Sequence, residues 1–551
     1  MVPNIAHNFL LGYSWILLLL PAIILVVHLV SYFVDSKHIR RNDIPGPTLA
    51  KVSGSWLGRV ALEGRQSEVV HELHKKFGTF VRLSPNHVSI SDPEALQVVY
   101  GHGNGMLKSE YYDAFAAPNL RRSVFDTRSR EEHARKRKAI SHIFSQKSVL
   151  EFEPYIHTHL TDFFKQWDKL CDGGRKGFSG IEGEGGWKGH DGRVWFNAMP
   201  WYNYLSFDII SDLAFGTPFG MIRKARDAVP VAIDHKAAMA QYGQIDTEYR
   251  DVKKLVIDTR EVPAIQVVNE QGEGVAQIAA FPPLWVPFLR CLPRFAKGMR
   301  RVEDFIGLVV LAVANRLAFP TERVDILSKL QQGKGEDGVP LTKEELTSEA
   351  LVQLIAGSDT TSNTTCAITY YVAANPHVQT KLQKELDNAL GHSENHVATY
   401  SQIKQLSYLD AVVNEGLRVH STVGIGLPRE VPEGGITVLG KSFPEGTVLS
   451  VPIYTIHRDP KVWGKDVDSF RPERWIEGDK AAMQKVFSPF SVGPRACTGR
   501  NLALMSLHIF IASIFRRYDI VLEQPDKPLE VHDAFARKPN SCRIGLKRRD
   551  V

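Results

Sequence analysis

The sequence predicts a mainly α-helical protein with a small β region, preceded by a single apolar N-terminal helix. Three observations predict this fold class. Helical periodicity dominates the second half of the chain, short alternating stretches are confined to residues 79–91 and 429–451, and residues 9–34 are almost uninterruptedly apolar. No internal repeat and no long polar linker divides the chain, so we expect one large unit instead of the about three or four domains that length alone would suggest.

Charge and cysteine content exclude several classes of protein. The chain has 67 basic and 61 acidic residues, a net charge of +6, which is too diffuse for a nucleic-acid interface but would suit a membrane surface or an acidic protein partner. The five cysteines contain no C-x-x-C pair, which argues against a disulfide framework and against structural zinc. They are Cys171, Cys291, Cys366, Cys497 and Cys542. We therefore expect the globular part to face a reducing compartment.

Residues 9–34 are expected to form a retained transmembrane anchor. The run is long enough to cross a hydrocarbon core of roughly 30 Å. It lacks the basic n-region and the small-residue cleavage site of a signal peptide. Basic residues between Lys37 and Arg41 follow it directly, which predicts that residues 1–8 are lumenal and that everything downstream is cytosolic. Residues 35–47 end in Pro-Gly-Pro and would form a stiff hinge before the globular part, residues 48–551.

The first half of the globular part carries mixed local signals. Residues 172–193 contain nine glycines among twenty-two residues and are predicted to be a mobile surface loop. Residues 221–300 have weak periodicity and no confident helix order, and residues 280–293 would be either a membrane-facing or access surface or a plain core loop. The clearer predictions are a helix at 67–77, a hairpin at 79–91, a functional loop at 100–126, a basic helix at 131–144, a buried helix at 203–219 and an amphipathic helix at 301–319.

A long helix is predicted from Thr342 to about Ala374. Thr342 and Glu345 match a capping box at its start. The centre of this helix, Ala356 to Ser362, combines small residues, an acid and consecutive threonines, which are poor helix formers. A local rule broken in the middle of a long element points to a functional site.

Further helices are predicted at residues 376–390 and 408–420. Glu415 and Arg418 lie at i and i+3, so their side chains meet on one helix face. Such pairs are usually exposed and weak, but Arg474, in the sequence Phe470-Arg-Pro-Glu-Arg-Trp475, would complete a buried Glu–Arg–Arg network. We expect a structural role for these residues.

The stretch Phe490-Ser-Val-Gly-Pro-Arg-Ala-Cys-Thr-Gly499 is predicted to be a turn-rich loop that delivers Cys497 to the start of a helix at 501–516. Gly493 and Gly499 allow a sharp turn, and the helix N-terminus together with Arg495 would favour a thiolate. A thiolate held by backbone amides beside an arginine is what a haem iron with an axial cysteine ligand requires. A buried structural cysteine is the alternative, but the joint spacing of these positions favours the haem.

Taken together, these motifs resemble the cytochrome P-450 superfamily. Cys497 with its flanks, Glu415 with Arg418, Arg474, and Ala356-Gly-Ser-Asp-Thr360 occur in the family's order and spacing. The resemblance covers the chain from Pro45 to its end, and the N-terminal anchor is similar to the microsomal type. It implies a triangular helical prism, haem b as cofactor, and a single-pass location in the endoplasmic reticulum membrane.

The resemblance also implies a role for each matching residue. Cys497 would be the iron ligand, with Phe490 beside it and Gly493 in the turn of the loop. Arg495, Arg137, Arg429 and, with less weight, His133 would contact the haem propionates. Asp359 and Thr360 resemble the acid–alcohol pair that delivers protons during oxygen activation, and Ala356 and Gly357 would leave room for dioxygen. Electrons would come from NADPH through a flavoprotein reductase, with cytochrome b5 as a further candidate, and the basic residues 135–138 are a hypothetical reductase-docking site.

Three segments are similar to the fungal benzoate 4-monooxygenases, which convert benzoate to 4-hydroxybenzoate: Tyr100–Ser109, Leu354–Thr364 and His420–Glu430. The substrate carboxylate would need donors in an apolar pocket, and residues 100–126 and 422–427 are the candidate segments. Alternatives are another phenolic or secondary-metabolite substrate, a haem-thiolate isomerase or dehydratase, and a non-enzymatic haem sensor. The Asp359–Thr360 pair argues against the isomerase, the dehydratase and the sensor, since these proteins have no use for oxygen protonation.

Overall fold

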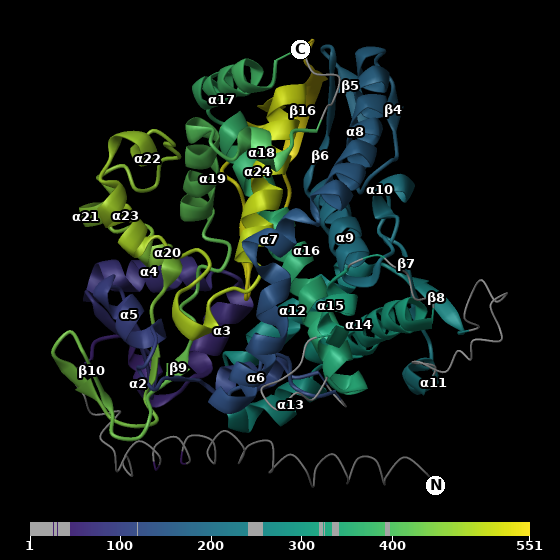
Figure 1. Ribbon diagram of the computed structural model, residues 1–551. Coiled ribbons are helices and arrows are strands. Elements are labelled where there is room, and N and C mark those ends of the chain that lie inside the picture. Colours follow the sequence, from purple (N-terminus) through teal and green to yellow (C-terminus); the bar gives the residue numbers. More distant parts are fainter. Residues whose placement is uncertain are drawn as a thin grey trace, which may run out of the picture.

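The computed structural model describes residues 26, 30, 44–117, 120–240, 257–318, 323, 325–332, 341–391 and 397–550. Figure 1 shows a mainly helical body with small sheets at its edges, which confirms the mainly helical globular part of the predicted fold class. Among the described residues, no helix is both long and apolar enough to cross a bilayer. The predicted anchor, residues 9–34, lies outside the described part of the chain except for Val26 and Val30, which are helical and exposed.

The central element is helix α16, Lys343–Ala373, which packs against α9 (Met199–Phe215), α19 (Ser407–His420) and α24 (Arg500–Arg517). The predicted capping box is present, because Thr342 Oγ1 accepts from the Glu345 amide and Glu345 accepts from the Thr342 amide. Every residue of α9 is buried, and the helix ends at Gly216 in the left-handed conformation. Helices α9, α19 and α24 bury apolar residues against α16, so the core is built around this helix.

The remaining helices surround this core, and they match the sequence-based boundaries where periodicity was strong. Helix α17 spans Pro376–Leu390 as predicted. The other long helices are α3 (Ser55–Glu63), α4 (Gln66–Phe77), α6 (Arg130–Ser141), α8 (Glu153–Arg175), α12 (Ala264–Ala279) and α14 (Pro293–Ala318). The shorter ones are α2 (Thr48–Val52), α5 (Glu94–Tyr100), α7 (Gln146–Leu150), α10 (Met221–Lys224), α11 (His235–Ala240), α13 (Val286–Cys291), α15 (Ile326–Gln332), α18 (Tyr400–Ile403), α20 (Ile453–Ile456), α21 (Pro460–Trp463), α22 (Arg474–Glu477) and α23 (Lys480–Val486).

One five-stranded sheet has the order β1-β2-β12-β9-β3. The predicted hairpin at 79–91 forms β1 and β2, β12 runs parallel to β2, and the other pairs are antiparallel. Its strands are Phe80–Ser84, His87–Ile90, Leu107–Lys108 (β3), Arg429–Glu430 (β9) and Val448–Ser450 (β12). The two-stranded ribbons are β7–β8 (Val229–Ala232, Thr259–Val262), β10–β11 (Ile436–Val438, Lys441–Phe443) and β14–β15 (Val531–Asp533, Arg537–Pro539).

The prediction of a mobile loop at residues 172–193 is wrong. Helix α8 continues to Arg175, and the segment then forms β4 (Ser179–Gly180) and β5 (Trp187–His190), with β6 (Arg193–Asn197) directly after it. These strands complete a sheet of order β13-β16-β6-β5-β4 with the C-terminal strands Tyr518–Leu522 and Arg543–Arg548. Glycines allow the tight turns between them, as at Gly192, where φ is +69°, and Trp187 packs into the core.

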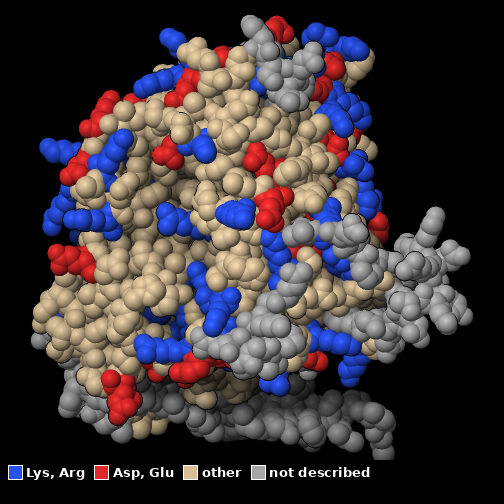
Figure 2. All heavy atoms as spheres, in the orientation of Figure 1, with Lys and Arg blue, Asp and Glu red and all other residues tan. Residues whose placement is uncertain are grey.

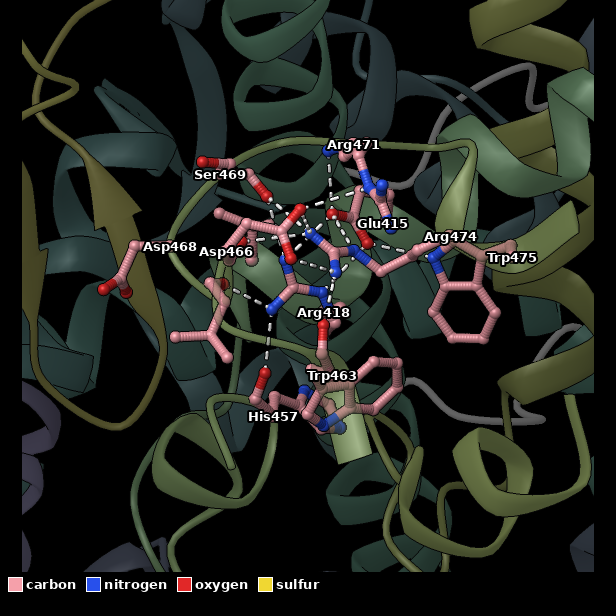
Figure 3. Close-up of polar contacts among 12 residues, drawn as sticks. Glu415, Arg418, His457, Trp463, Asp466, Asp468, Ser469, Arg471, Arg474 and Trp475 are labelled. Carbon is pink, nitrogen blue, oxygen red and sulfur yellow. Dashed lines mark hydrogen bonds and ion pairs between the residues drawn. The ribbon is translucent and has the colours of Figure 1, made fainter. Parts of the chain in front are cut away.

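The predicted Glu–Arg–Arg network is present and fully buried (Figure 3). The two Glu415 carboxylate oxygens accept from Arg418 at 2.8 and 2.9 Å and from Arg474 at 2.9 Å. The indole of Trp475 and the amide of Arg471 also donate to Glu415, each at 2.9 Å. Both guanidinium groups donate further to backbone carbonyls, among them those of residues 457, 463, 467 and 469. One carboxylate therefore ties α19 to the irregular segment that precedes the cysteine loop.

Glu415→Gln should lower the free energy of unfolding by about 3–5 kcal/mol, because it leaves two buried guanidinium groups without their counter-charge. Denaturant unfolding of the holoenzyme, followed by haem absorbance and far-ultraviolet circular dichroism, measures this loss. The matched control is Glu523→Gln, which breaks a partly exposed ion pair with Arg543 and should cost less than about 1 kcal/mol. Equal losses in the two variants would contradict the structural role of Glu415.

Candidate functional site

The cysteine loop closes tightly against helix α5. The Cys497 amide donates to the Phe490 carbonyl at 2.9 Å, and the 3₁₀ turn η4 (Gly493–Arg495) lies between them. Gly493 has a φ of +73°, and a Cβ there would lie 1.9 Å from the Tyr100 carbonyl oxygen. Glycine is therefore required at position 493, for conformation and for space. The loop leads directly into α24, as predicted.

The electrostatics of Cys497 differ from the prediction. Burial is the largest influence and raises the pKa of the thiol, while the Gly499 amide, Arg137 and Arg500 lower it. Arg137 reaches the loop from α6 and donates through Nη1 to the Ala496 carbonyl at 2.6 Å. Arg495, which we expected to favour the thiolate, instead points away to other carbonyls. The loop alone therefore does not secure a thiolate, and a bound metal cation is what would ionise the sulfur.

Arg495 belongs to a buried cluster of cations. It donates to the carbonyls of Thr127 at 2.7 Å and Arg128 at 3.1 Å. Burial, and then the charge of Arg429, lower its pKa to about 10. His133 lies on α6 close to these cations. Burial, and then the charge of Arg495 and its neighbours, lower its pKa to about 3, so this imidazole is neutral. The predicted propionate ligands are thus brought together.

Lys108 is a member of this cluster that the sequence analysis missed. Strands β3 and β9 pair antiparallel in a register that sets Lys108 opposite Arg429. Its ammonium group donates to the Phe125 carbonyl and lies 4.1 Å from the centre of the Tyr112 ring. Burial, and the charges of Arg429 and Arg495, hold its pKa well below the usual value. A lone lysine in a glycine- and aromatic-rich loop carries no local signal, since only strand pairing places it beside Arg429.

The cluster fits an anionic ligand. Lys108, Arg137, Arg429 and Arg495 make no ion pair with any carboxylate in the described ranges. Buried like charges repel each other and are costly unless a counter-charge is supplied. The two propionates of a haem would supply it beside Cys497, and an arginine guanidinium can bind a carboxylate through two parallel hydrogen bonds. These residues therefore fit a haem with Cys497 as its axial ligand.

The centre of α16 shows how threonines are accommodated there. Thr360 Oγ1 donates to the Ala356 carbonyl at 2.7 Å, and the hydroxyls of Thr364 and Thr365 donate to carbonyls four residues earlier. Ala356 is exposed although it lies midway along a core helix, which indicates an internal space beside it. Gly357 also serves the packing of the helix. A Cβ there would lie 2.6 Å from Ile210, so this glycine is needed for the close approach of α9 to α16.

Aromatic rings from distant parts of the chain meet near Lys108. Phe115, Phe125 and Phe535 contact each other edge to face, with ring centres 5.4–5.5 Å apart, and all three are only partly buried. Phe115 ends the 3₁₀ helix η1 (Glu110–Phe115), and Phe535 lies at the turn between β14 and β15. We call these three residues the phenylalanine wall. The loop at 100–126, predicted to be functional, supplies two of them.

A pocket of about 1040 Å³ is lined by η1, by residues between Ala279 and Pro287, and by residues of the five-stranded sheet that contains β9. The lining includes Tyr111 and Phe281, while Leu284 and Phe288 are 65% and 66% exposed. Residues 280–293 form η3 (Pro283–Trp285) and α13, so they are a partly exposed rim of the pocket and not a plain core loop.

The basic run of α6 is not the solvated docking face that was proposed for a reductase. Lys136 is 1% exposed and lies 3.4 Å from Glu345, Arg135 pairs with Glu132 and Glu345, and Arg137 reaches the cysteine loop. The helix therefore uses most of its charges internally. On the face shown in Figure 2, Lys and Arg side chains are interspersed with Asp and Glu and form no single patch.

Comparison with known proteins agrees with this geometry. A family profile described as Cytochrome P450 matches residues 44–545. The chain therefore belongs to the cytochrome P450 family, which confirms the resemblance of its motifs. Membership implies a haem iron with a cysteine thiolate and a redox partner that supplies electrons.

Curated relatives narrow the class. The chain is 42% identical to benzoate 4-monooxygenase bphA of Aspergillus niger over 535 residues, 96% of each chain. It is 31% identical to cytochrome P450 monooxygenase ORF11 of Penicillium roqueforti, over 87% of this chain and 89% of the relative. It is 30% identical to cytochrome P450 monooxygenase traB of Penicillium crustosum, over 88% and 87%. The protein is a P450 monooxygenase, which sets aside the isomerase, dehydratase and sensor alternatives.

Different residues of the site would bind the haem and transfer protons. When bound, haem supplies the redox chemistry that activates dioxygen. Cys497 would hold its iron, and Lys108, Arg137, Arg429 and Arg495 would hold its propionates. The phenylalanine wall would supply an apolar surface beside the site, and Asp359 with Thr360 would hold and move protons.

Cys497→Ser should abolish the spectrum of the thiolate-ligated ferrous carbon-monoxide complex and reduce turnover to background, because a serine hydroxyl does not replace the thiolate. Absorbance spectroscopy of the reduced protein checks this. Cys291→Ser, at an exposed cysteine of α13, is the matched control and should keep the normal spectrum. A thiolate-type spectrum in Cys497→Ser would remove this residue from the site.

Lys108→Met should accelerate haem loss by about tenfold or more, because a charge-assisted hydrogen bond to a buried carboxylate contributes about 1.5–3 kcal/mol. Haem transfer from the holoenzyme to an excess of an acceptor protein measures the rate. Lys51→Met, on the exposed side of α2, is the control. Unchanged haem retention would mean that Lys108 does not face a propionate.

Proposed function

We propose that this monooxygenase hydroxylates a small aromatic acid, and that its substrate is benzoate, converted to 4-hydroxybenzoate. Benzoate, O2, NADPH and one proton would yield 4-hydroxybenzoate, water and NADP⁺. The observation that carries the proposal is the phenylalanine wall, three partly buried rings that offer their edges and faces to a flat apolar ring. The extended similarity to a protein named benzoate 4-monooxygenase supports the same substrate.

The pocket lined by η1 and by residues between Ala279 and Pro287 supports an access route for such a substrate. Its lining combines apolar residues with polar groups at Ser109, Tyr111 and Arg290. Burial raises the pKa of the Tyr111 phenol, so Tyr111 stays protonated and can donate to a passing carboxylate. Leu284, which lines the pocket, and the nearby Phe288 are both exposed apolar side chains, which suits a membrane-proximal entrance.

We also propose the cellular setting. Residues 9–34 would anchor the enzyme in the endoplasmic reticulum membrane with the catalytic domain in the cytosol, where an NADPH-dependent flavoprotein reductase would supply electrons. Cytochrome b5 is a second candidate donor. The composition of residues 9–41 supports the anchor, and family membership supports a redox partner of some kind.

Benzoate should shift the haem absorption spectrum of the ferric enzyme with micromolar to submillimolar affinity, and substituted benzoates should bind more weakly as the para substituent grows. A titration series of benzoate, 4-methylbenzoate, benzamide and toluene tests both the carboxylate and the ring. Product analysis with reductase and NADPH should then show 4-hydroxybenzoate.

Phe535→Ala should weaken benzoate binding, because each edge-to-face interaction between the substrate ring and a phenylalanine is worth about 0.5–1.5 kcal/mol. The same titration of the ferric enzyme measures the change in affinity. Phe178→Ala, which truncates a 60% exposed ring, is the matched control. No response to benzoate, together with a clear response to toluene or benzamide, would overturn the substrate assignment and leave the P450 class intact.

A further inference from the structure

Lys538 lies beside the acid of α16, and no motif pointed to it. It is on β15, and its ammonium nitrogen lies 3.8 Å from Asp359 Oδ1. The same nitrogen donates to Asn269 Oδ1 on α12. Among the described residues, Lys538 is the cation that forms an ion pair with Asp359. It connects the β14–β15 ribbon, which carries Phe535, to the middle of the central helix.

Further polar groups continue from Lys538 toward solvent. The carboxylates of Glu184 and Asp227 raise the pKa of Lys538, against burial, which is the largest influence and lowers it. Glu184 is exposed in the turn between β4 and β5, and Asp227 is half-buried and accepts from the first amides of α12. The side chain of Tyr204 is fully buried, and burial, followed by the charges of the same two carboxylates, raises the pKa of its hydroxyl.

Hydroxylation places a specific demand on this region. Each turnover inserts one oxygen atom into a C–H bond and reduces the other to water, which takes up two electrons and two protons. The protons have to reach the haem side of α16 from solvent. An acid that delivers them must be reloaded each time, and its carboxylate must stay within reach of Thr360.

We propose that Lys538 is a positioning residue for proton delivery: its ammonium group holds the Asp359 carboxylate in place and ties it, through Asn269, to α12. The inference rests on the proposed role of Asp359 and Thr360. A carboxylate with a fixed orientation can accept a proton from the solvent side and pass it toward the Thr360 hydroxyl at each turnover.

A purely structural role is the competing explanation, because the same ion pair also fastens the β14–β15 ribbon to α16. The two roles differ in what they control. A fastening residue affects stability and substrate binding, whereas a positioning residue affects how electrons are divided between product and peroxide.

The experiment compares Lys538→Met, Lys538→Arg and the control Lys547→Met, an exposed lysine on β16, as holoenzymes with reductase and NADPH. Product formed per NADPH should fall about tenfold in Lys538→Met, the lower end of the loss when a residue that orients a catalytic group is removed. Peroxide should rise by the matching amount, the solvent deuterium isotope effect should change, and Lys538→Arg should restore most of the coupling. Lys547→Met should behave as wild type.

A second measurement does not depend on turnover. After reductive ¹³C-methylation, the Lys538 signal is assigned by its absence in Lys538→Arg, and its pKa is followed by nuclear magnetic resonance. Asp359→Asn should lower that pKa, because the carboxylate that raises it is removed. An unchanged Lys538 pKa would show that the ion pair is absent in solution and would overturn the proposal.

The outcomes separate this inference from the function on which it rests. If Thr360→Ala and Asp359→Asn leave coupling intact, the proton-delivery pair itself fails. If they uncouple the enzyme while Lys538→Met does not, the pair stands and the role of Lys538 is overturned. If Lys538→Met does not fold, Lys538→Gln still decides: it keeps a hydrogen-bond donor without the charge, it should lower coupling, and wild-type coupling would refute the role of Lys538.

Discussion

Four cations gather beside the cysteine loop without an ion-pair partner among the described carboxylates: Lys108 and Arg429 are buried, and Arg137 and Arg495 are partly buried. The site depends on this arrangement, because the protein itself supplies no negative charge that neutralises these four cations. The repulsion is built in by strand register, since β3 and β9 set Lys108 opposite Arg429. A dianionic ligand removes the repulsion and gains charge-assisted hydrogen bonds at the same time. Binding of haem is thereby coupled to the stability of this part of the fold.

The Glu415 network handles buried charge in the opposite way. There the chain supplies its own counter-charge, and Arg418 and Arg474 also bind backbone carbonyls. Such a network ties elements together but leaves nothing for a ligand to satisfy. The charges of the Glu415 network are neutralised within the protein, which indicates a structural role. The four cations beside the cysteine loop are not neutralised, which indicates a role in binding. It also explains why the two sets are adjacent: the satisfied network fixes the segment from which the cysteine loop emerges.

Much of the architecture could be predicted from local sequence. Helix α17, the capping box at Thr342 and the end of α9 at Gly216 follow from periodicity and cap chemistry, which act within a few residues. The glycine-rich segment at 172–193 could not, because its strands exist through pairing with β6 and, beyond it, the C-terminal strand β16. Local composition describes a flexible chain, and the long-range partner decides otherwise.

The residues of the candidate site also form two groups, those that a local motif predicts and those that it does not. Cys497, Arg495 and the Asp359–Thr360 pair stand in recognisable spacings, whereas Lys108 and Lys538 are single lysines without a motif. Gly357 shows the converse, since a residue in a motif also has a packing role against Ile210 on α9 that the motif does not reveal. Residues selected by a partner on another element leave no local pattern, and only the folded chain reveals them.

Helix α16 separates two electrostatic regions with different tasks. The cysteine loop and its cations form a region that attracts and holds negative charge. Around Lys538, the ammonium group pairs with the Asp359 carboxylate, so that region combines an acid with its counter-charge. A monooxygenase needs both regions, because electrons and protons must reach dioxygen together without releasing it as peroxide. The phenylalanine wall lies between them, with Phe125 against Lys108 and Phe535 three residues before Lys538. These rings therefore form an apolar partition between the buried cations and the Lys538–Asp359 pair.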